Sequence, residues 1–456
     1  IFYCAECHEP LVTDATIEAV ATCFEKEGSD AWWKHEADEL LPKGTKCPKC
    51  GHPHFTKEKD IMDVWFDSGS SHMGVLKTRP ELEWPCAMYL EGSDQHRGWF
   101  QSSLLTSVAA TGKAPYRSVL THGYVVDGDG RKMSKSVGNV IAPQDIIKQY
   151  GADIVRLWVA SADYKQDIRI SKLILKQLTE IYRKIRNTIR YILGNTSDFD
   201  YAKDKVAFAD MQELDQWALM RLQKLKKEVG TAYEEYEFHV LFHAIHNFCA
   251  VEMSSFYLDI IKDRLYASRQ DDQIRRSAQT AMYEILNDLV VMLAPVLSFT
   301  MEEVWQFMKK PADAPESVQM QTWPEVKEEY INETLEAKYD NFIALRGEVT
   351  RVLEGHRQAK TIGNSLEAKL VLYAEGEALQ ILRSVEKDLA ALLIVSQVVL
   401  EEGAAAGEEA TDRADLKVTV KPADGHKCER CWTYSETVGT DPEHPELCAR
   451  CAAVVK

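Results

Sequence analysis

Four Cys-x-x-Cys pairs are the feature that most constrains the fold of this chain. Eight of the eleven cysteines belong to them, in the pairs Cys4/Cys7, Cys47/Cys50, Cys428/Cys431 and Cys448/Cys451. A Cys-x-x-Cys turn aims two thiolates at one tetrahedral ion. With no secretory segment in the sequence, paired spacing of this kind indicates zinc more often than disulfides. The sequence therefore predicts two four-thiolate zinc sites, one near each end of the chain.

The two predicted sites differ in the segment that separates their pairs. Between Cys431 and Cys448 the segment has the length of a loop, which is typical of a zinc ribbon. Between Cys7 and Cys47 it is longer, and residues 14–41 are amphipathic and predicted to be helical. A cluster without metal is therefore the alternative at the first site. We expect one zinc ion at the C-terminal site and, where the first site is filled, a second.

Composition limits the class of protein. The chain has 456 residues, 45% of them hydrophobic, which is enough for about three domains with real cores. Its net charge of -17 argues against binding nucleic acid through bulk positive charge, so an RNA partner would need local basic patches. The most apolar stretch, residues 286–299, is too short to span a bilayer, and no membrane association is expected.

A basic loop follows an unusually strong turn signal. Asp127-Gly128-Asp129-Gly130 precedes the string Arg-Lys-Met-Ser-Lys-Ser, which contains Lys132, Ser134 and Lys135. A Lys ammonium about 4 Å from a phosphate oxygen contributes roughly 4 kcal/mol at an effective dielectric of about 20. That energy accelerates a reaction only if it is larger in the transition state than in the ground state. The alternative is a solvated basic turn.

A dense polar turn lies between a short strand and a helix. Residues 87–90 are predicted to form the strand, 91–100 the turn and 101–110 the helix. The turn contains Glu91, Gly92, Asp94, Gln95 and Trp99, at the carboxyl end of a parallel strand, where ligands bind in open α/β sheets. Residues 119–126 form the next predicted strand. Upstream, residues 63–70 are predicted to be a strand that enters a Gly turn and carries Trp65.

The remainder of the chain is predicted to be mainly helical. From 176 to 340 helical periodicity dominates, with one apolar face in the first helix and three arginines off that face, Arg183, Arg186 and Arg190. Residues 341–420 alternate strand and helix and include an acidic linker at 401–415. In the last segment Arg430 and Arg450 lie inside the knuckles beside Trp432, which suits phosphate contact with base stacking. Solvated charge is the alternative for all five arginines.

Several of these strings resemble the class I aminoacyl-tRNA synthetases. Lys-Met-Ser-Lys-Ser looks like their signature loop, and Trp-Phe-Asp-Ser-Gly resembles a motif of the Ile/Leu/Val group. Glu-Gly-Ser-Asp-Gln-His-Arg-Gly-Trp-Phe is similar to the form found in bacterial isoleucyl-tRNA synthetases, whose C-terminal zinc finger the last segment also resembles. The resemblance implies that Lys132 and Lys135 are catalytic and, with Ser134, bind ATP. It further implies isoleucyl-adenylate contacts for six residues: Glu91, Gly92, Asp94, Gln95, Trp65 and Trp99.

The resemblance also implies an architecture and a set of partners. We expect the second half of an α/β nucleotide-binding (Rossmann-like) domain at 1–175, a helical anticodon-binding bundle at 176–340, a small α/β junction domain at 341–420 and a zinc ribbon at 421–456. The implied activity is ATP- and Mg²⁺-dependent activation of L-isoleucine and its transfer to tRNA(Ile), by a cytoplasmic monomer. The His-Ile-Gly-His signature and the editing domain are absent, so we expect this chain alone to be inactive. A non-catalytic tRNA-binding module and a valyl- or leucyl-type synthetase are the alternatives.

Overall fold

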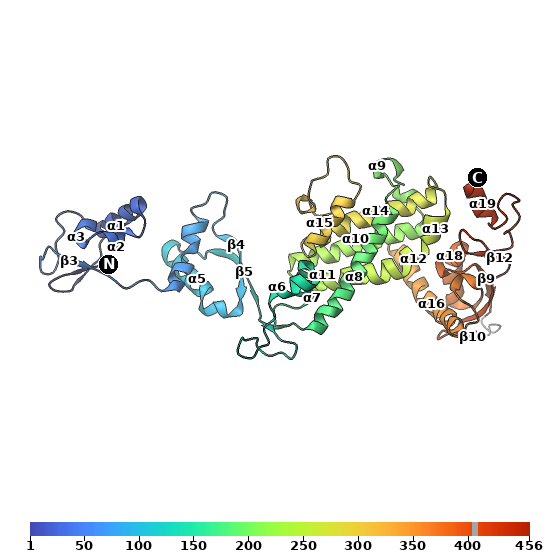
Figure 1. The fold of residues 1–456 in the computed structure, drawn as a ribbon, viewed down its shortest axis with the longest axis horizontal. Coiled ribbons are helices and arrows are strands. Elements are labelled where there is room, and N and C mark those ends of the chain that lie inside the picture. The colour runs from blue at the N-terminus through green and yellow to red at the C-terminus, as the bar shows by residue number, and fades with distance from the viewer. Residues whose placement is uncertain (404–408) are drawn as a thin grey trace. The chain divides into compact units, whose positions relative to one another are not determined.

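The computed structural model describes residues 1–403 and 409–456, and they fall into two compact units, 1–122 and 123–456. Figure 1 shows the order of the elements along the chain. Part of the predicted acidic linker, residues 404–408, lies outside the described residues. Its flanks belong to strands, since β9 extends to Glu402 and β10 begins at Glu409. The prediction of a linker across 401–415 was therefore wrong at residues 401–402 and 409–410, whereas 411–415 have no regular secondary structure, as predicted.

The first unit begins with a small antiparallel sheet and three short helices. The sheet has the order β2-β1-β3, and its strands are β1 (Phe2–Cys4), β2 (Pro10–Leu11) and β3 (Phe55–Lys57). The predicted helical segment is α1 (Asp14–Glu27), α2 (Ala31–Lys34) and α3 (Ala37–Leu40). Apolar side chains of the sheet and the helices, including Phe2, Leu40 and Phe55, form one core with Cys4 and Cys47. This core is small, which makes a metal ion useful to its stability.

The first unit continues as a parallel strand pair with a connecting helix. The elements are α4 (Val64–Gly69), η1 (His72–Leu76), β4 (Cys86–Gly92), η2 (Ser93–Arg97), α5 (Trp99–Thr111) and β5 (Tyr116–His122). Strands β4 and β5 run parallel, as the sequence predicts for a βαβ unit. The strand predicted at 63–70 was wrong, because the side chain of Asp63 caps a helix there by accepting from Trp65 N at 2.8 Å.

The second unit opens with short elements around the basic loop. Strand β6 (Val125–Val126) pairs in parallel with β7 (Ile168–Arg169), and α6 (Pro143–Tyr150) and α7 (Ala152–Ser161) lie between them in sequence. The single strand predicted at 119–126 is broken at Gly123. A Cβ on that residue would lie 2.4 Å from the backbone of Gln166, so only glycine allows this close approach.

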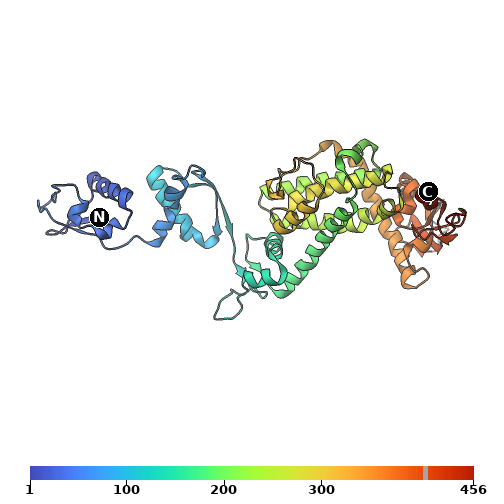
Figure 2. The same cartoon turned by 45° about the horizontal axis from the view of Figure 1, so that its top comes forward.

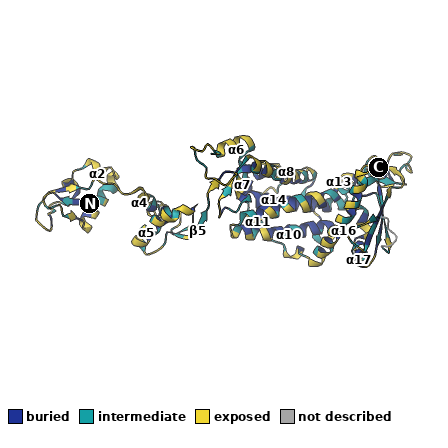
Figure 3. Cartoon of the chain, turned by 90° about the horizontal axis from the view of Figure 1, so that it is seen from below, coloured by how far each residue is buried: buried dark blue, intermediate teal, exposed yellow. Residues whose placement is uncertain are grey.

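A helical bundle forms the body of the second unit. Its elements are α8 (Lys172–Asn195), α9 (Tyr201–Asp204), α10 (Glu213–Glu234), α11 (Phe238–Asn247), η4 (Phe248–Tyr257), α12 (Leu258–Ile260), α13 (Lys262–Ala267), α14 (Gln273–Leu293), α15 (Ser298–Phe307) and α16 (Glu333–Gln358). Helices α10 and α14 pack side by side in the middle of the bundle (Figure 2). Figure 3 shows that both are largely buried. Helix α14 ends two residues before Pro295, which cannot continue a helix without loss of a backbone hydrogen bond.

A small α/β domain and a cysteine module complete the second unit. The sheet has the order β10-β11-β8-β9, formed by β8 (Ala368–Ala374), β9 (Gln397–Glu402), β10 (Glu409–Ala410) and β11 (Leu416–Pro422). Two helices, α17 (Gly376–Ser384) and α18 (Leu389–Leu393), lie between β8 and β9 in sequence, so strand and helix alternate here as predicted. The cysteine module contains β12 (His426–Lys427), β13 (Tyr434–Ser435) and α19 (Ala449–Val455).

Candidate functional site

The polar turn lies where two parallel strands end at the same edge. In the register of β4 and β5, Glu91 is opposite Thr121 and Gly92 is opposite His122. The Glu91 carboxylate accepts from Gly92 N at 3.0 Å and lies 3.9 Å from the ring Nε2 of His122. His122 was not singled out in the sequence, because only the strand register brings it beside Glu91. A carboxylate and an imidazole at the carboxyl ends of adjacent strands form a polar edge suited to ligand binding.

Aromatic packing holds Trp99 behind this edge. Its ring stacks on that of Tyr89, with centroids 4.2 Å apart and planes within 5°, and its indole nitrogen donates to Ser68 O at 3.1 Å. The amide oxygen of Gln95 accepts from Trp99 N at 2.9 Å, so it caps the first turn of α5. Tyr89 is 3% exposed and was missed in the sequence, where its strand position offered no polar signal. Trp99 is thus oriented by contacts on three sides.

Trp65 lies close to the same turn. A Cβ built on Gly98 would be 3.4 Å from the Trp65 ring and 2.6 Å from the Gln95 amide oxygen, so a side chain here would displace the Gln95 amide. Helices α4 and α5 approach equally closely, because a Cβ on Gly69 would lie 2.6 Å from the Ser102 hydroxyl. Trp65 itself is 47% exposed. The structure therefore places Trp65 beside Gly98, next to Trp99 in the chain, and leaves about half of its surface in solvent.

The basic loop leaves two of its three cations without a partner. Arg131 pairs with Asp127 at 3.1 Å and with Asp129 at 2.9 Å. Lys132 and Lys135 are exposed, and within the described residues neither ammonium has an ion-pair or hydrogen-bond partner. Ser134 is half-buried, and its hydroxyl accepts from Val137 N at 3.3 Å. The loop therefore presents two free ammonium groups to solvent, as binding of a polyphosphate would require.

The first cysteine cluster has the geometry of a metal site. Sulfur atoms lie 3.5 Å apart between Cys4 and Cys50 and 3.6 Å apart between Cys7 and Cys47, and the four fit within 4.8 Å. A tetrahedral ion with Zn–S bonds of about 2.3 Å requires sulfur–sulfur distances of about 3.8 Å. The backbone N–H of Cys50 lowers the pKa of Cys47 to about 6, which favours the thiolate. The four residues therefore fit zinc.

The second cluster is more enclosed. Cys428, Cys448 and Cys451 are buried, and the Cys431 and Cys448 sulfurs are 3.8 Å apart. Burial raises the pKa of Cys428, but backbone N–H groups of Cys431, Cys448 and Arg430 outweigh it and lower the pKa to about 6. The four-thiolate set at this end again matches zinc. A third group, Cys23, Glu27 and His35, is less suitable, because His35 already pairs with two carboxylates, of Glu27 at 2.9 Å and Glu39 at 3.7 Å.

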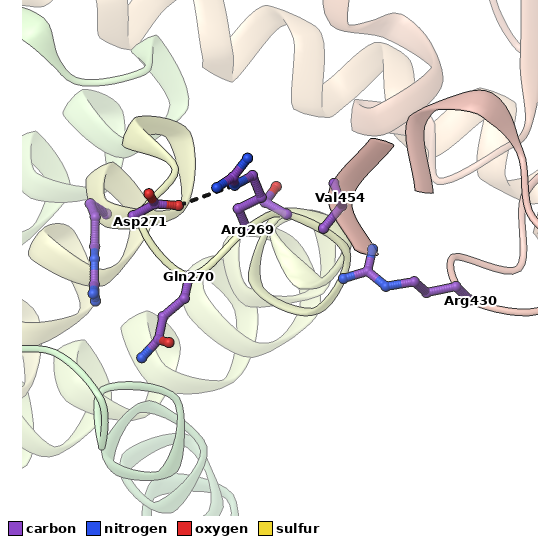
Figure 4. Close-up of a pocket in the computed structure, with 7 residues that line it drawn as sticks. Arg269, Gln270, Asp271, Arg430 and Val454 are labelled. Carbon is purple, nitrogen blue, oxygen red and sulfur yellow. Dashed lines mark ion pairs between the residues drawn. The ribbon is translucent and has the colours of Figure 1, made fainter. Parts of the chain in front are cut away.

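The two arginines of the second cluster hold it against the helical bundle. Arg450 makes a two-bond ion pair with Asp263 on α13, at 2.6 and 2.7 Å, and Arg430 donates to the carbonyl of Ala267. Next to this contact is an open polar hollow of about 520 Å³ (Figure 4), lined by Ser268, Arg269, Gln270, Asp271, Arg276, Arg430 and Val454. Trp432 remains 61% exposed. Both arginines therefore have a docking role that the sequence did not predict.

The other three predicted arginines lie on the solvent side of α8. Arg183 pairs with Glu180 at 2.6 Å, whereas Arg186 and Arg190 have no ion-pair partner among the described residues. Ile185 and Ile189 on the opposite face are buried in the bundle, as the periodicity predicts.

No described helix has both the length and the apolar character needed to cross a membrane.

Three family models match the chain. They are tRNA synthetases class I (I, L, M and V) over residues 1–171, the anticodon-binding domain of tRNA ligase over 215–372 and the zinc finger found in FPG and IleRS over 425–454. The last match and the four-thiolate geometry identify the C-terminal module as a zinc finger.

Curated relatives match from end to end of the chain. Isoleucine–tRNA ligases of Moorella thermoacetica and Geobacter sulfurreducens are each 55% identical to it, over 460 and 456 residues. These alignments include 100% of the chain and 50% and 49% of the relatives, so the chain spans about half the length of the relatives it matches. A solved ternary complex of an Agrobacterium radiobacter K84 LeuRS with tRNA and LeuAMS is similar in fold, with a TM-score of 0.51 at 18% identity over 73% of this chain and 41% of that chain.

Proposed function

Because this chain belongs to the class I tRNA synthetases and is related over its whole length to isoleucine–tRNA ligases, we propose that it is the part of such a ligase that carries the lysine loop and the tRNA-binding domains. The reaction is ATP-dependent activation of L-isoleucine to isoleucyl-AMP, with Mg²⁺, followed by transfer to tRNA(Ile). The observation that carries this proposal is the 54–55% identity that extends over all 456 residues. The relatives' name comes from longer chains, so the activity belongs to the longer protein.

On this proposal, the lysine loop supplies charge rather than a nucleophile. Lys132 and Lys135, with Ser134, bind the phosphates of ATP and stabilise the negative charge that builds on departing pyrophosphate. The free state of both ammonium groups supports this role, because an ion pair within the protein would compete with the phosphate. Attack by the isoleucine carboxylate then depends on positioning, and no side chain forms a covalent intermediate.

The strand-turn binds the adenylate in this scheme. Glu91 and Gly92, together with Asp94 and Gln95, contact its amino-acid and ribose side, and the two indoles of Trp65 and Trp99 form an apolar wall for the isoleucine side chain. The stacking of Trp99 on Tyr89 supports the wall, because a preorganised ring needs no ordering when substrate binds. One missing methylene changes binding by only about 1–3 kcal/mol, and isoleucyl-tRNA synthetase is itself the standard example of this limit.

The tRNA contacts lie on the second unit. We propose that the helical domain at 176–340 and the zinc ribbon at 421–456, with the junction domain at 341–420 between them, bind tRNA(Ile), and that 1–175 belongs to the catalytic domain. Arg183, Arg186 and Arg190 contact the phosphate backbone, and Arg430 and Arg450 combine the docking of the ribbon with contact to RNA. Trp432 supports the second role, because its ring is exposed and has the Lys427 ammonium 5.5 Å from its centroid, an arrangement that suits base stacking beside a cation. The ligase functions as a cytoplasmic monomer.

Exchange of pyrophosphate into ATP tests the catalytic part. The purified chain is expected to show none, whereas a chain of the relatives' length that contains this segment is expected to show isoleucine-dependent exchange. Lys135→Ala in the longer chain should reduce the rate by about 10²-fold. Lys148→Ala removes an exposed lysine from α6 and serves as the matched control. Exchange by the short chain would contradict its expected inactivity, and unchanged exchange in Lys135→Ala would contradict the role of the loop.

Binding to three tRNAs tests specificity. The chain is titrated with tRNA for isoleucine, valine and an unrelated amino acid at two salt concentrations. A preference for the isoleucine tRNA that zinc chelation weakens would support the proposal, and each lost phosphate contact should reduce the salt slope by about 1. Arg186→Glu is compared with Lys43→Glu, the same charge change at an exposed position of the first unit. Equal binding to all three tRNAs would favour a general tRNA-binding module, and preference for the valine tRNA a valyl-type synthetase.

A further inference from the structure

Two side chains close the base of the lysine loop. Asp127 lies directly before the loop and Asn139 at its end, and the Asn139 amide donates to the Asp127 carboxylate at 2.9 Å. The same amide group donates to Lys132 O at 3.2 Å, and its oxygen accepts from Ser134 N at 2.9 Å. We refer to Asp127 and Asn139 as the loop latch. Through it, three points of the loop that are apart in sequence share one hydrogen-bonded centre.

The latch carboxylate is the most heavily hydrogen-bonded group in the loop. One oxygen of Asp127 accepts from Asp129 N at 3.0 Å and Arg131 N at 2.9 Å, and the other accepts from Arg131 Nε at 3.1 Å in addition to Asn139. Asp127 is 8% exposed. A buried carboxylate with four donors is stable in only one orientation, because any rotation leaves lone pairs or donors unpaired.

Apolar contacts hold the loop at two further points. Met133 and Ile141 are partly buried and pack against the core of the second unit. Gly138 has a φ of 74° and donates to Ser134 O at 3.1 Å, which allows the chain to turn back toward Asn139. With Met133 directed to the core, Lys132 and Lys135 on either side of it remain in solvent.

From this arrangement we infer that Asp127 and Asn139 are positioning residues, which hold the backbone of Lys132 and Ser134 so that the two free lysines reach the phosphates together. The inference rests on the proposed function of the loop. Neither residue needs to touch the nucleotide. They reduce the conformational freedom that the loop would otherwise lose when the reaction begins, and preorganised charge is more effective than charge that must first be ordered.

The two aspartates of the turn provide a matched pair of variants. Asp127→Asn places an amide N–H₂ against the donors of Asn139 and Arg131, whereas Asp129→Asn affects only an exposed ion pair. Hydrogen exchange of the Ser134 amide in this chain reports the latch, because that amide bonds to Asn139. We expect exchange about tenfold faster in Asp127→Asn and Asn139→Ala, and unchanged in Asp129→Asn. The Leu289 amide in the buried α14 should be unchanged in all three, which excludes global unfolding.

A double-mutant cycle tests whether the latch acts through the lysines. In a chain of the relatives' length, Asn139→Ala is expected to reduce the rate of ATP–pyrophosphate exchange about tenfold with little change in KM for ATP. In a Lys132→Ala, Lys135→Ala background, the same substitution should have less than a twofold effect, because the groups that it positions are gone. Purely structural damage would reduce both rates by the same factor.

The two experiments separate the failure of this inference from failure of the proposed function. Unchanged Ser134 exchange in Asp127→Asn, or equal acceleration in Asp129→Asn, would overturn the latch whatever the activity. Additive losses in the double-mutant cycle would overturn the positioning role. A third outcome is faster hydrogen exchange at Ser134 together with a rate of ATP–pyrophosphate exchange that does not depend on Lys132 and Lys135. It would contradict the proposed function of the loop instead, and with it the positioning role.

Discussion

The strand-turn and the lysine loop both follow short strands, but they are held in different ways. The strand-turn is fixed by a buried aromatic stack, in which Trp99 lies 4.2 Å from Tyr89. The lysine loop is fixed by a buried carboxylate, Asp127, with four hydrogen-bond donors. Apolar packing is non-directional and depends little on pH, whereas a hydrogen-bonded carboxylate is directional and titrates. The strand-turn is therefore expected to be rigid, whereas the lysine loop is expected to keep its conformation only while the hydrogen bonds of its carboxylate are intact.

The largest effect is expected at the aromatic stack. Tyr89→Ala removes a 3% exposed ring and should lower the free energy of unfolding of the first unit by about 3–5 kcal/mol. Tyr89→Phe keeps the ring and loses only a 3.4 Å contact of the hydroxyl with Ser103, so it should cost less than about 1 kcal/mol. Denaturant unfolding followed by hydrogen exchange in α5 measures both. Equal costs for the two variants would mean that the hydroxyl, not the stack, holds the turn.

In the lysine loop, by contrast, a substitution should leave stability almost unchanged and reduce activity strongly. Lys135→Ala is expected to change the free energy of unfolding by less than about 0.5 kcal/mol, because the side chain is exposed and has no hydrogen-bond or ion-pair partner among the described residues. It should nevertheless reduce ATP–pyrophosphate exchange by the longer chain about 10²-fold, or about 2.7 kcal/mol of activation free energy. A variant that loses stability and activity in proportion would remove the distinction between the two regions.

A smaller effect is expected for the cap of α5. Gln95→Ala removes the side chain that accepts from Trp99 N and should destabilise the first unit by about 1 kcal/mol. Gln101→Ala changes the same residue type at an exposed position within α5 and is expected to be neutral. Thermal unfolding of the two variants gives the difference. If Gln95→Ala were as costly as Tyr89→Ala, the turn would depend on polar contacts much as the loop does.

The smallest difference expected between the two regions is in their response to acid. Hydrogen bonds, first of all from Asn139, lower the pKa of Asp127 from 3.8 to about 2. A depressed pKa means that the latch contributes fully above about pH 4 and weakens as pH falls from there toward 2. The stack of Trp99 on Tyr89 has no group that titrates in this window. NMR signals of the Ser134 amide and the Trp99 indole should therefore respond differently, and a parallel response would indicate unfolding rather than loss of the latch.

Sequence reasoning succeeded where the signal was local. The spacing of the cysteines determines which thiolates meet, and both clusters have the expected members. The strand, turn and helix around Glu91 follow from apolar runs and turn residues that are adjacent in the chain. The prediction of a strand at 63–70 was wrong because its apolar residues suit a helix as well as a strand. The Asp63 side chain, which caps the first turn, favours the helix.

The contacts that hold these sites could not be predicted in the same way. The stacking of Tyr89 on Trp99 depends on which side of β4 faces α5, and the ion pair of Arg450 with Asp263 joins residues that are 187 positions apart in the sequence. From the sequence alone, Tyr89 could equally be an ordinary core residue and Asp263 an ordinary surface residue. Their contacts exist only because elements distant in sequence pack together.

By itself the sequence determined which cysteines belong to each four-thiolate cluster and the succession of strand, turn and helix around Glu91, because each of these depends on short-range spacing. The tertiary structure decided how those residues are held. It paired Arg131, left Lys132 and Lys135 without an ion-pair partner in the described part of the chain, and enclosed the carboxylate of Asp127 at the base of the loop. Burial and hydrogen bonding depend on what surrounds a side chain in space, and the chain must fold before those surroundings exist.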